Sequence, residues 1–168
     1  VVDKFPESPH VNLTRYGLGV AYYQKGDLDK ARELMEAIPP ADRTGDLAAV
    51  PYQLADCMIR SAPAKADDAV AAGKLEEALQ TAAGLLDAFA AGQPNNPQAP
   101  DALLKLGYCR QRLAGLLAQP PDQQKALADA RAAYEQLLQK YSKSDAVPQA
   151  TFERAKCLAA QKDVNGAM

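Results

Sequence analysis

The sequence is poor in the residues on which most enzymes and metal proteins rely. It has no tryptophan, one histidine and three cysteines in 168 residues, and aromatic residues make up 6 %. A single histidine, His10, excludes most histidine-based metal sites and catalytic pairs. No dinucleotide-binding glycine motif, P-loop or nucleophile elbow occurs. We therefore expect no catalytic site, no metal and no cofactor.

Long hydrophobic runs and blocks of like charge are also missing. No apolar stretch approaches the roughly 18 residues that a membrane-spanning helix requires. The net charge is −2 and neither sign is concentrated in one block, whereas nucleic-acid binding needs a basic face. We expect no direct membrane insertion and no nucleic acid partner.

The chain does contain a repeated helical pattern. Residues 15–31 predict one helix, a tight turn at Gly26-Asp27 and the start of a second helix. Sliding this segment along the chain finds matching positions, each with a small residue that allows close helix approach: Gly19, Ala55, Gly107 and Ala155. No period-two alternation indicates a strand, so we predict an all-α fold.

Turn and cap residues set the expected helix limits. Ser8, Asn96 and Ser144 occupy equivalent positions and are predicted N-caps. The third helix contains Pro51, so it either begins near Val50 or is kinked. The expected helices cover 8–24, 28–38, 44–61, 64–91 with a break possible at Gly73, 96–118, 122–141 and 144–161.

The pattern resembles the tetratricopeptide repeat. The first copy has Leu18, Gly19, Tyr22, Gly26 and Ala31. The other copies offer Leu54, Ala55, Met58, Gly73 and Ala78, then Leu106, Gly107 and Ala130, and finally Ala155 and Ala167. The resemblance implies a right-handed superhelical stack of antiparallel helical hairpins, a tetratricopeptide-like solenoid. It would have about four repeats, at 8–40, 44–92, 96–141 and 144–168, the terminal ones truncated.

The whole chain, 1–168, is expected to form one domain. Val1 to Phe5 align with the tail of a second helix, Gly166 to Met168 only begin one, and no initiator methionine is present. We interpret the sequence as a piece of a longer protein.

The two middle hairpins are longer than the outer ones. The small residue of the first helix and the alanine of the second are 12 residues apart in repeats one and four, but 23 apart in repeats two and three. We expect these 11 extra residues to lengthen both helices of each hairpin by roughly 1.5 turns. The extensions, 61–72 and about 113–125, should project at the same edge and pack through their apolar residues. Exposure of Leu116 and Leu117 is the alternative.

The three cysteines, Cys57, Cys109 and Cys157, all align with Ala21. Equivalent sites in successive hairpins lie too far apart for a disulfide, which needs Cα atoms within about 7 Å. We expect free, buried thiols that serve as small apolar residues.

The resemblance also implies a binding surface, because first helices of tetratricopeptide hairpins line a concave groove that holds peptides or protein segments. The groove candidates in this chain are Tyr16, Val20, Tyr23, Tyr52, Asp56, Arg60, Leu104, Tyr108, Gln111, Arg112 and Lys156, and Phe152 is a further candidate in the fourth repeat. The alternative for Tyr16, Tyr52 and Phe152 is packing between neighbouring helices, and packing is favoured for Phe152. The lysine of the chaperone-type carboxylate clamp is not matched.

We therefore expect a non-catalytic scaffold whose partner is a protein or peptide. The linker Phe5-Pro6-Glu7-Ser8 and the segment 134–152 resemble tetratricopeptide proteins of the bacterial cell envelope, including outer-membrane assembly and Tol–Pal-associated components. That resemblance favours the periplasm. A cytoplasmic regulatory domain attached to an enzyme or secretion component is the alternative, and an enzyme in its own right is a third class.

Overall fold

The computed structural model describes residues 8–166, which form a row of α-helices connected by tight turns. The helices are α1 (Val11–Lys25), α2 (Leu28–Glu36), α3 (Val50–Ser61), α4 (Ala69–Gly92), α5 (Ala99–Ala114), α6 (Pro120–Lys140) and α7 (Val147–Gly166). Two 3₁₀ turns, η1 (Pro40–Asp42) and η2 (Gly45–Leu47), lie between α2 and α3. No strand occurs in this range, and the all-α prediction is confirmed.

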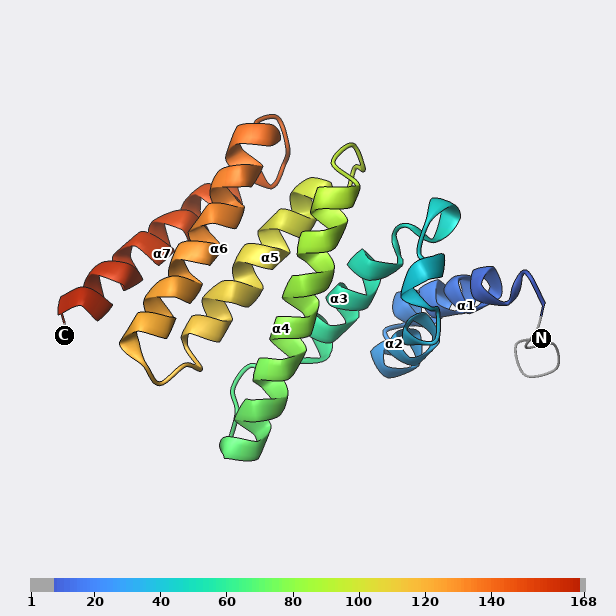
Figure 1. Ribbon diagram of the computed structural model, residues 1–168, viewed down its shortest axis with the longest axis horizontal. Helices are drawn as coiled ribbons and strands as arrows, with labels where there is room; N and C mark the ends of the chain where they lie inside the picture. The colour runs from blue at the N-terminus through green and yellow to red at the C-terminus, as the bar shows by residue number, and fades with distance from the viewer. Residues whose placement is uncertain (1–7, 167–168) are drawn as a thin grey trace.

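Each odd-numbered helix up to α5 pairs with the helix that follows it, and α7 packs on α6. The row therefore runs from α1 at one end to α7 at the other (Figure 1). None of the helices in the described range is both long and apolar enough to cross a membrane. This arrangement is the tetratricopeptide-like solenoid of hairpins that the repeat pattern implies.

The turn between α1 and α2 depends on two residues. Gly26 has a φ of 82°, a left-handed conformation that glycine adopts without the steric cost of a Cβ. Asp27 then caps α2 by accepting a hydrogen bond from the backbone N–H of Lys30 at 3.3 Å. The predicted tight turn at Gly26-Asp27 is confirmed.

The turns before α1, α5 and α7 share one geometry, which corrects the predicted N-caps. The carbonyls of Ser8, Asn96 and Ser144 each accept the N–H of the first helical residue three positions later, at 2.9, 2.9 and 3.1 Å. Their side-chain oxygens accept the N–H two positions later, at 3.3, 2.9 and 3.2 Å. These residues thus form the turn that precedes the helix, and the helices begin later than predicted.

The third helix begins at Val50, which confirms one of the two predicted alternatives, with Pro51 in its first turn where the missing N–H costs little. The limits of the next two helices differ from the prediction. Residues 62–68 are a loop, and α4 begins only after Asp68, whose carboxylate caps it at 2.7 Å from the N–H of Ala71. No break occurs at Gly73, and the fifth helix ends at Ala114 instead of 118.

The extra residues of the middle hairpins are not shared between their two helices as predicted. The first helices keep similar lengths of 15, 12 and 16 residues, whereas the second helices have 9, 24 and 21. Pro63 follows α3 and Gly115 follows α5, so neither first helix extends, and the added residues enter the loop and the second helix.

The two extensions meet at one edge of the row. Nη2 of Arg112 donates to the carbonyl of Pro63 at 2.6 Å. Ala66 and Leu116 are both half-buried against the main core, and Leu117 is half-buried. The extensions therefore enlarge the core and do not leave Leu116 and Leu117 exposed. The hydrogen bond between Arg112 and Pro63, which links the two extensions, is nevertheless polar.

The helices of each hairpin approach most closely where one of them has a small residue. Gly19 faces Met35, and Gly107 faces the fully buried ring of Tyr134. The second helices repeat a buried small–large–large triplet: Ala31 and Met35 in α2 with Ile38 just after its end, Ala82, Leu86 and Phe89 in α4, and Ala130, Tyr134 and Leu137 in α6. Ala82 is thus the counterpart in repeat two, and the predicted Ala78 is wrong because it is only half-buried.

The core consists of two clusters. The larger extends from α3 to α7, and the smaller contains Met35, Ile38, Val50 and Leu54 and joins the first hairpin to α3. Leu18 is 43 % exposed, whereas its counterparts in α3 and α5 are buried, because α1 is the first helix of the described row.

The three cysteines are buried, as predicted. Burial raises the pKa of Cys57 and Cys157 to about 11 and that of Cys109 to about 12, because a thiolate loses its hydration inside the protein. Such thiols are poor nucleophiles at neutral pH, so their role is packing.

The raised thiol pKa values predict alkaline destabilisation. Above about pH 9 the unfolded chain releases thiol protons that the folded protein retains, so stability falls by about 1.4 kcal/mol per pH unit for each such thiol. Urea unfolding between about pH 8 and about pH 10.5 should show this loss, with a smaller slope in Cys109→Ala. Equal slopes in the two proteins would contradict the assignment.

The close approach at Gly107 predicts an unusually costly alanine substitution. A Cβ there would lie 2.8 Å from Cδ1 of Tyr134 and closer still to Cε1 and Cζ. Gly107→Ala should therefore lower the free energy of unfolding by about 1–3 kcal/mol. The control is Gly17→Ala, whose Cβ meets nothing within 4 Å; because alanine favours helix by about 1 kcal/mol over glycine, it should stabilise. Chemical denaturation measures both, and an unchanged midpoint for Gly107→Ala would refute the packing.

Candidate functional site

A charged network joins successive first helices on one surface. We call the surface where side chains of α1, α3, α5 and α7 meet one another the first-helix face. Asp56 of α3 is 4 % exposed. Nζ of Lys105 in α5 lies 2.7 Å from Oδ1 of Asp56, 2.7 Å from Oδ2 of Asp101 and 2.9 Å from the hydroxyl oxygen of Tyr52. The Tyr52 hydroxyl donates to Oδ2 of Asp101 at 2.6 Å.

Lys105 uses all three of its protons in this network, because an ammonium group has three donors and each meets an acceptor. Burial alone would lower the pKa of Lys105, but the bonds to Asp101, Asp56 and Tyr52 outweigh it and raise that pKa. Burial, aided by the bond to Asp101, raises the pKa of Tyr52 to about 12. Lys105 therefore stays charged and Tyr52 stays neutral across the physiological range.

The carboxylate of Asp56 also binds a side chain of the first hairpin. The Tyr23 hydroxyl of α1 donates a short hydrogen bond to Oδ2 of Asp56. Burial and then this bond raise the pKa of Tyr23. Arg60 lies 3.9 Å from Asp56 and 4.9 Å from the centre of the Tyr23 ring. One buried aspartate thus connects α1, α3 and α5.

The α5–α7 end of the face has exposed aromatic rings. Tyr108 is 44 % exposed and Phe152 is 59 % exposed. On α7, Glu153 is buried, accepts from the Gln149 amide at 2.9 Å and pairs with Lys156 at 2.9 Å. Large exposed rings beside buried polar groups are typical of protein contact surfaces.

A cavity of about 220 Å³ lies between α5 and α7 at this end. Helix α5 contributes polar and apolar side chains to its wall, α6 contributes Tyr134, and α7 contributes two polar side chains. Its lining residues are Asp101, Leu104, Lys105, Tyr108, Tyr134, Gln149 and Glu153. It therefore adjoins the charged network and the exposed ring of Tyr108.

Several predicted groove residues come together on the face. Tyr23, Tyr52, Asp56 and Arg60 belong to the network or contact it. Tyr52 also packs 5.5 Å from the ring of Phe89, so part of it serves the core. Their role in binding a partner stays a prediction.

The other predicted residues are more dispersed. Tyr16 and Val20 pack on the smaller core cluster, which fits the packing alternative for Tyr16. Gln111 accepts a bond from Tyr134 at 3.1 Å and Arg112 is bonded to the loop after α3, whereas Leu104 lines the cavity. The packing favoured for Phe152 is wrong: most of its ring is exposed.

Sequence reasoning missed four polar residues of the face. They are Asp101, Lys105, Gln149 and Glu153. Two i,i+4 pairs, Asp101 with Lys105 and Gln149 with Glu153, were the available signal, since such pairs meet on one helix face. Nothing in the sequence indicated that Lys105 would also reach Asp56 on another hairpin.

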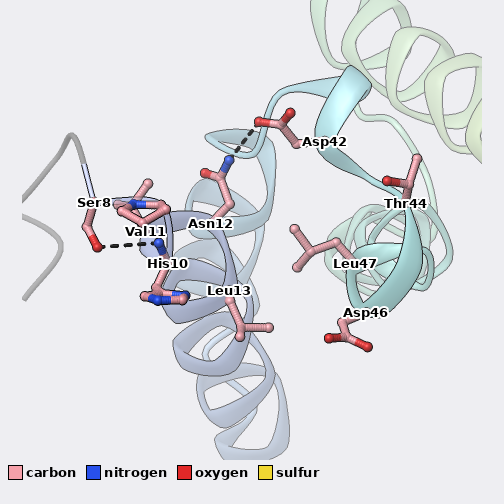
Figure 2. A pocket seen from close by; sticks show the side chains of 10 residues that line it. Ser8, His10, Val11, Asn12, Leu13, Asp42, Thr44, Asp46 and Leu47 are labelled. Atoms are coloured by element: carbon pink, nitrogen blue, oxygen red, sulfur yellow. Dashed lines mark hydrogen bonds between the residues drawn. The ribbon is translucent and has the colours of Figure 1, made fainter.

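A second hollow lies at the start of α1 but has no comparable chemistry (Figure 2). It measures about 460 Å³, and Nδ2 of Asn12 donates across it to Oδ2 of Asp42 at 2.8 Å. His10 lies on the opposite side from Asp42 and Asp46 in Figure 2. Within residues 8–166, no three His, Cys, Asp or Glu side chains cluster as metal ligands would.

Comparison with known families decides what these hairpins are. Residues 1–50 match one tetratricopeptide repeat model, and residues 64–118 and 122–168 match a second. The chain belongs to the tetratricopeptide repeat family. Repeats of this family mediate protein–protein interactions and are typically non-catalytic. No curated protein matches the chain. In this tetratricopeptide protein Asp56 lies between the matched segments, whereas Tyr23 and Lys105, which bind its carboxylate, lie within them.

The network predicts that Lys105 is essential for stability. Lys105→Met would remove the closest counter-charge of the buried Asp56 carboxylate and leave only the more distant Arg60 at 3.9 Å. This should lower the free energy of unfolding by on the order of 2 kcal/mol. Lys30→Met is the control, because Lys30 and its partner Asp27, 3.2 Å away, are both exposed to solvent. This substitution should change the free energy of unfolding little. Equal urea midpoints for the two variants would show that the network contributes nothing.

Proposed function

We propose that this tetratricopeptide protein is a non-catalytic scaffold that binds a protein segment on its first-helix face, chiefly across α5 and α7. The observation that carries the proposal is the exposed ring of Tyr108 at the cavity, together with the exposed ring of Phe152 on α7. Rings of this kind supply most of the energy in protein contacts, particularly around a hollow that a partner side chain can fill.

The rest of the face supports binding by being fixed in advance. Lys105 and Asp56 hold α3 and α5 together, and Tyr23 attaches α1 to the same carboxylate. A surface that is already ordered loses less conformational entropy when a partner binds. A net charge of −2 without a basic face argues against nucleic acid as that partner.

A role in bacterial cell-envelope assembly is the finer proposal, and it rests on the linker sequences. The structure gives the segment at Tyr141 a role of its own, since its hydroxyl donates to the carbonyl of Pro94 at 2.7 Å and Ser144 builds the next turn. Such a linker suits any stacked hairpins. The regulatory-domain alternative is therefore kept, and the sequence preceding Val1 in the gene discriminates: a signal peptide or lipoprotein cysteine supports the envelope, and a catalytic domain the alternative.

The binding proposal predicts which exposed residues matter. A peptide selected from a displayed library should bind with an affinity that Tyr108→Ala/Phe152→Ala reduces by at least about tenfold, the size of a hot-spot loss. Val70→Ala is the matched control, since Val70 is 68 % exposed but lies at the start of α4. Calorimetric titration measures affinity and circular dichroism verifies folding. Equal affinity of the double variant and the wild type would contradict the proposed surface.

A further inference from the structure

We propose that the cavity between α5 and α7 receives a lysine or arginine side chain of the bound segment. This inference rests on the proposed function and adds the chemistry of the partner. Three observations support it: the charges that line the cavity, the hydrogen-bond donors there that already have partners, and the apolar side chains of its wall.

The charges that line the cavity are unequal. Two carboxylates, Asp101 and Glu153, face it with one ammonium group, that of Lys105. Lys105 is in addition shared with Asp56, which lies outside the lining. Glu153 pairs with Lys156 at 2.9 Å, but Lys156 lies outside the lining. Among the groups that line the cavity, carboxylates therefore outnumber cations two to one, and an entering cation would complement them.

The hydrogen bonds at the cavity also favour a cationic ligand. The three protons of Lys105 are all used within the network. The Tyr134 hydroxyl donates to Gln111, and the Gln149 amide donates to Glu153. In the described part of the chain no group donates a hydrogen bond to Oδ1 of Asp101, and the side chain of Asp101 is 42 % exposed. The cavity thus offers acceptors to a ligand whose own groups are donors.

The walls suit a long side chain with an apolar stem. Leu104 and the rings of Tyr108 and Tyr134 provide apolar surface along the cavity. Lysine and arginine bury their methylene stems against such surface while their charged ends reach polar groups, and the exposed Tyr108 ring can add a cation–π contact. An acidic side chain would instead meet two carboxylates, so the cavity would discriminate against it.

The test is a nitrogen–proton NMR titration of the whole chain with three blocked pentapeptides. All have alanine at four positions, and the central residue is arginine, citrulline or glutamate. The arginine peptide should shift the amide signals of Leu104, Tyr108 and Gln149. Citrulline, which has the same shape without the charge, should bind at least about fivefold more weakly, and the glutamate peptide should cause no shift at these signals.

Two variants locate the effect. Glu153→Gln should weaken arginine-peptide binding by about threefold or more, whereas Glu135→Gln on α6, whose carboxylate pairs with Arg131 at 3.4 Å, should not. Should Glu153→Gln not fold, Gln149→Lys is the substitute, since Gln149 is exposed. It should reverse the preference toward the glutamate peptide.

The outcomes separate this inference from the proposed function. Equal shifts by arginine and citrulline, or shifts on the first-helix face that avoid the cavity, would overturn the basic pocket and leave peptide binding intact. Preference for the glutamate peptide by the wild type would do the same. Absence of any shift would also overturn the pocket, and the library-selected peptide would then decide the scaffold function by itself.

Discussion

The close approach of two helices at a residue without a side chain is the constraint on which the hairpins depend. Gly107 allows the ring of Tyr134 to lie against the backbone of α5, and Gly19 allows the same for Met35 against α1. Dispersion contacts fall off steeply with distance, so this proximity, more than the length of the helices, fixes how each hairpin packs. The extra residues of the middle hairpins add turns to the starts of α4 and α6, beyond this contact.

Relations between hairpins have a different physical origin. The apolar clusters bring the hairpins together, but they are two clusters and not one continuous core. The buried carboxylate of Asp56 bridges the boundary, because one oxygen accepts from Tyr23 in the first hairpin and the other meets Lys105 in the third. A buried charge must be paired, and this requirement gives the stack a directional bond that apolar contact lacks.

The bonded network at one end of the first-helix face and the accessible rings at the other are the basis of the proposed partner site. Toward α1 the first-helix face is occupied by its own bonds, and Arg60 covers the Tyr23 ring. Toward α7 the rings of Tyr108 and Phe152 remain accessible and a cavity separates the helices. Under the proposed function, the fixed end would preorganise the face and the accessible end would contact the partner.

The sequence by itself determined the helical class, the repeat and the tight turn at Gly26, because small residues and turn residues act locally and recur at fixed spacing. It also located the burial of the three cysteines through their alignment. It placed the counterpart of Ala31 in α4 at Ala78, one helical turn before the correct Ala82, since several alanines there fit the pattern equally well. Only the tertiary structure decided that Phe152 is exposed, that the extensions enter the second helices, and that Asp56 and Lys105 meet. These outcomes depend on distances between hairpins, which no local spacing specifies.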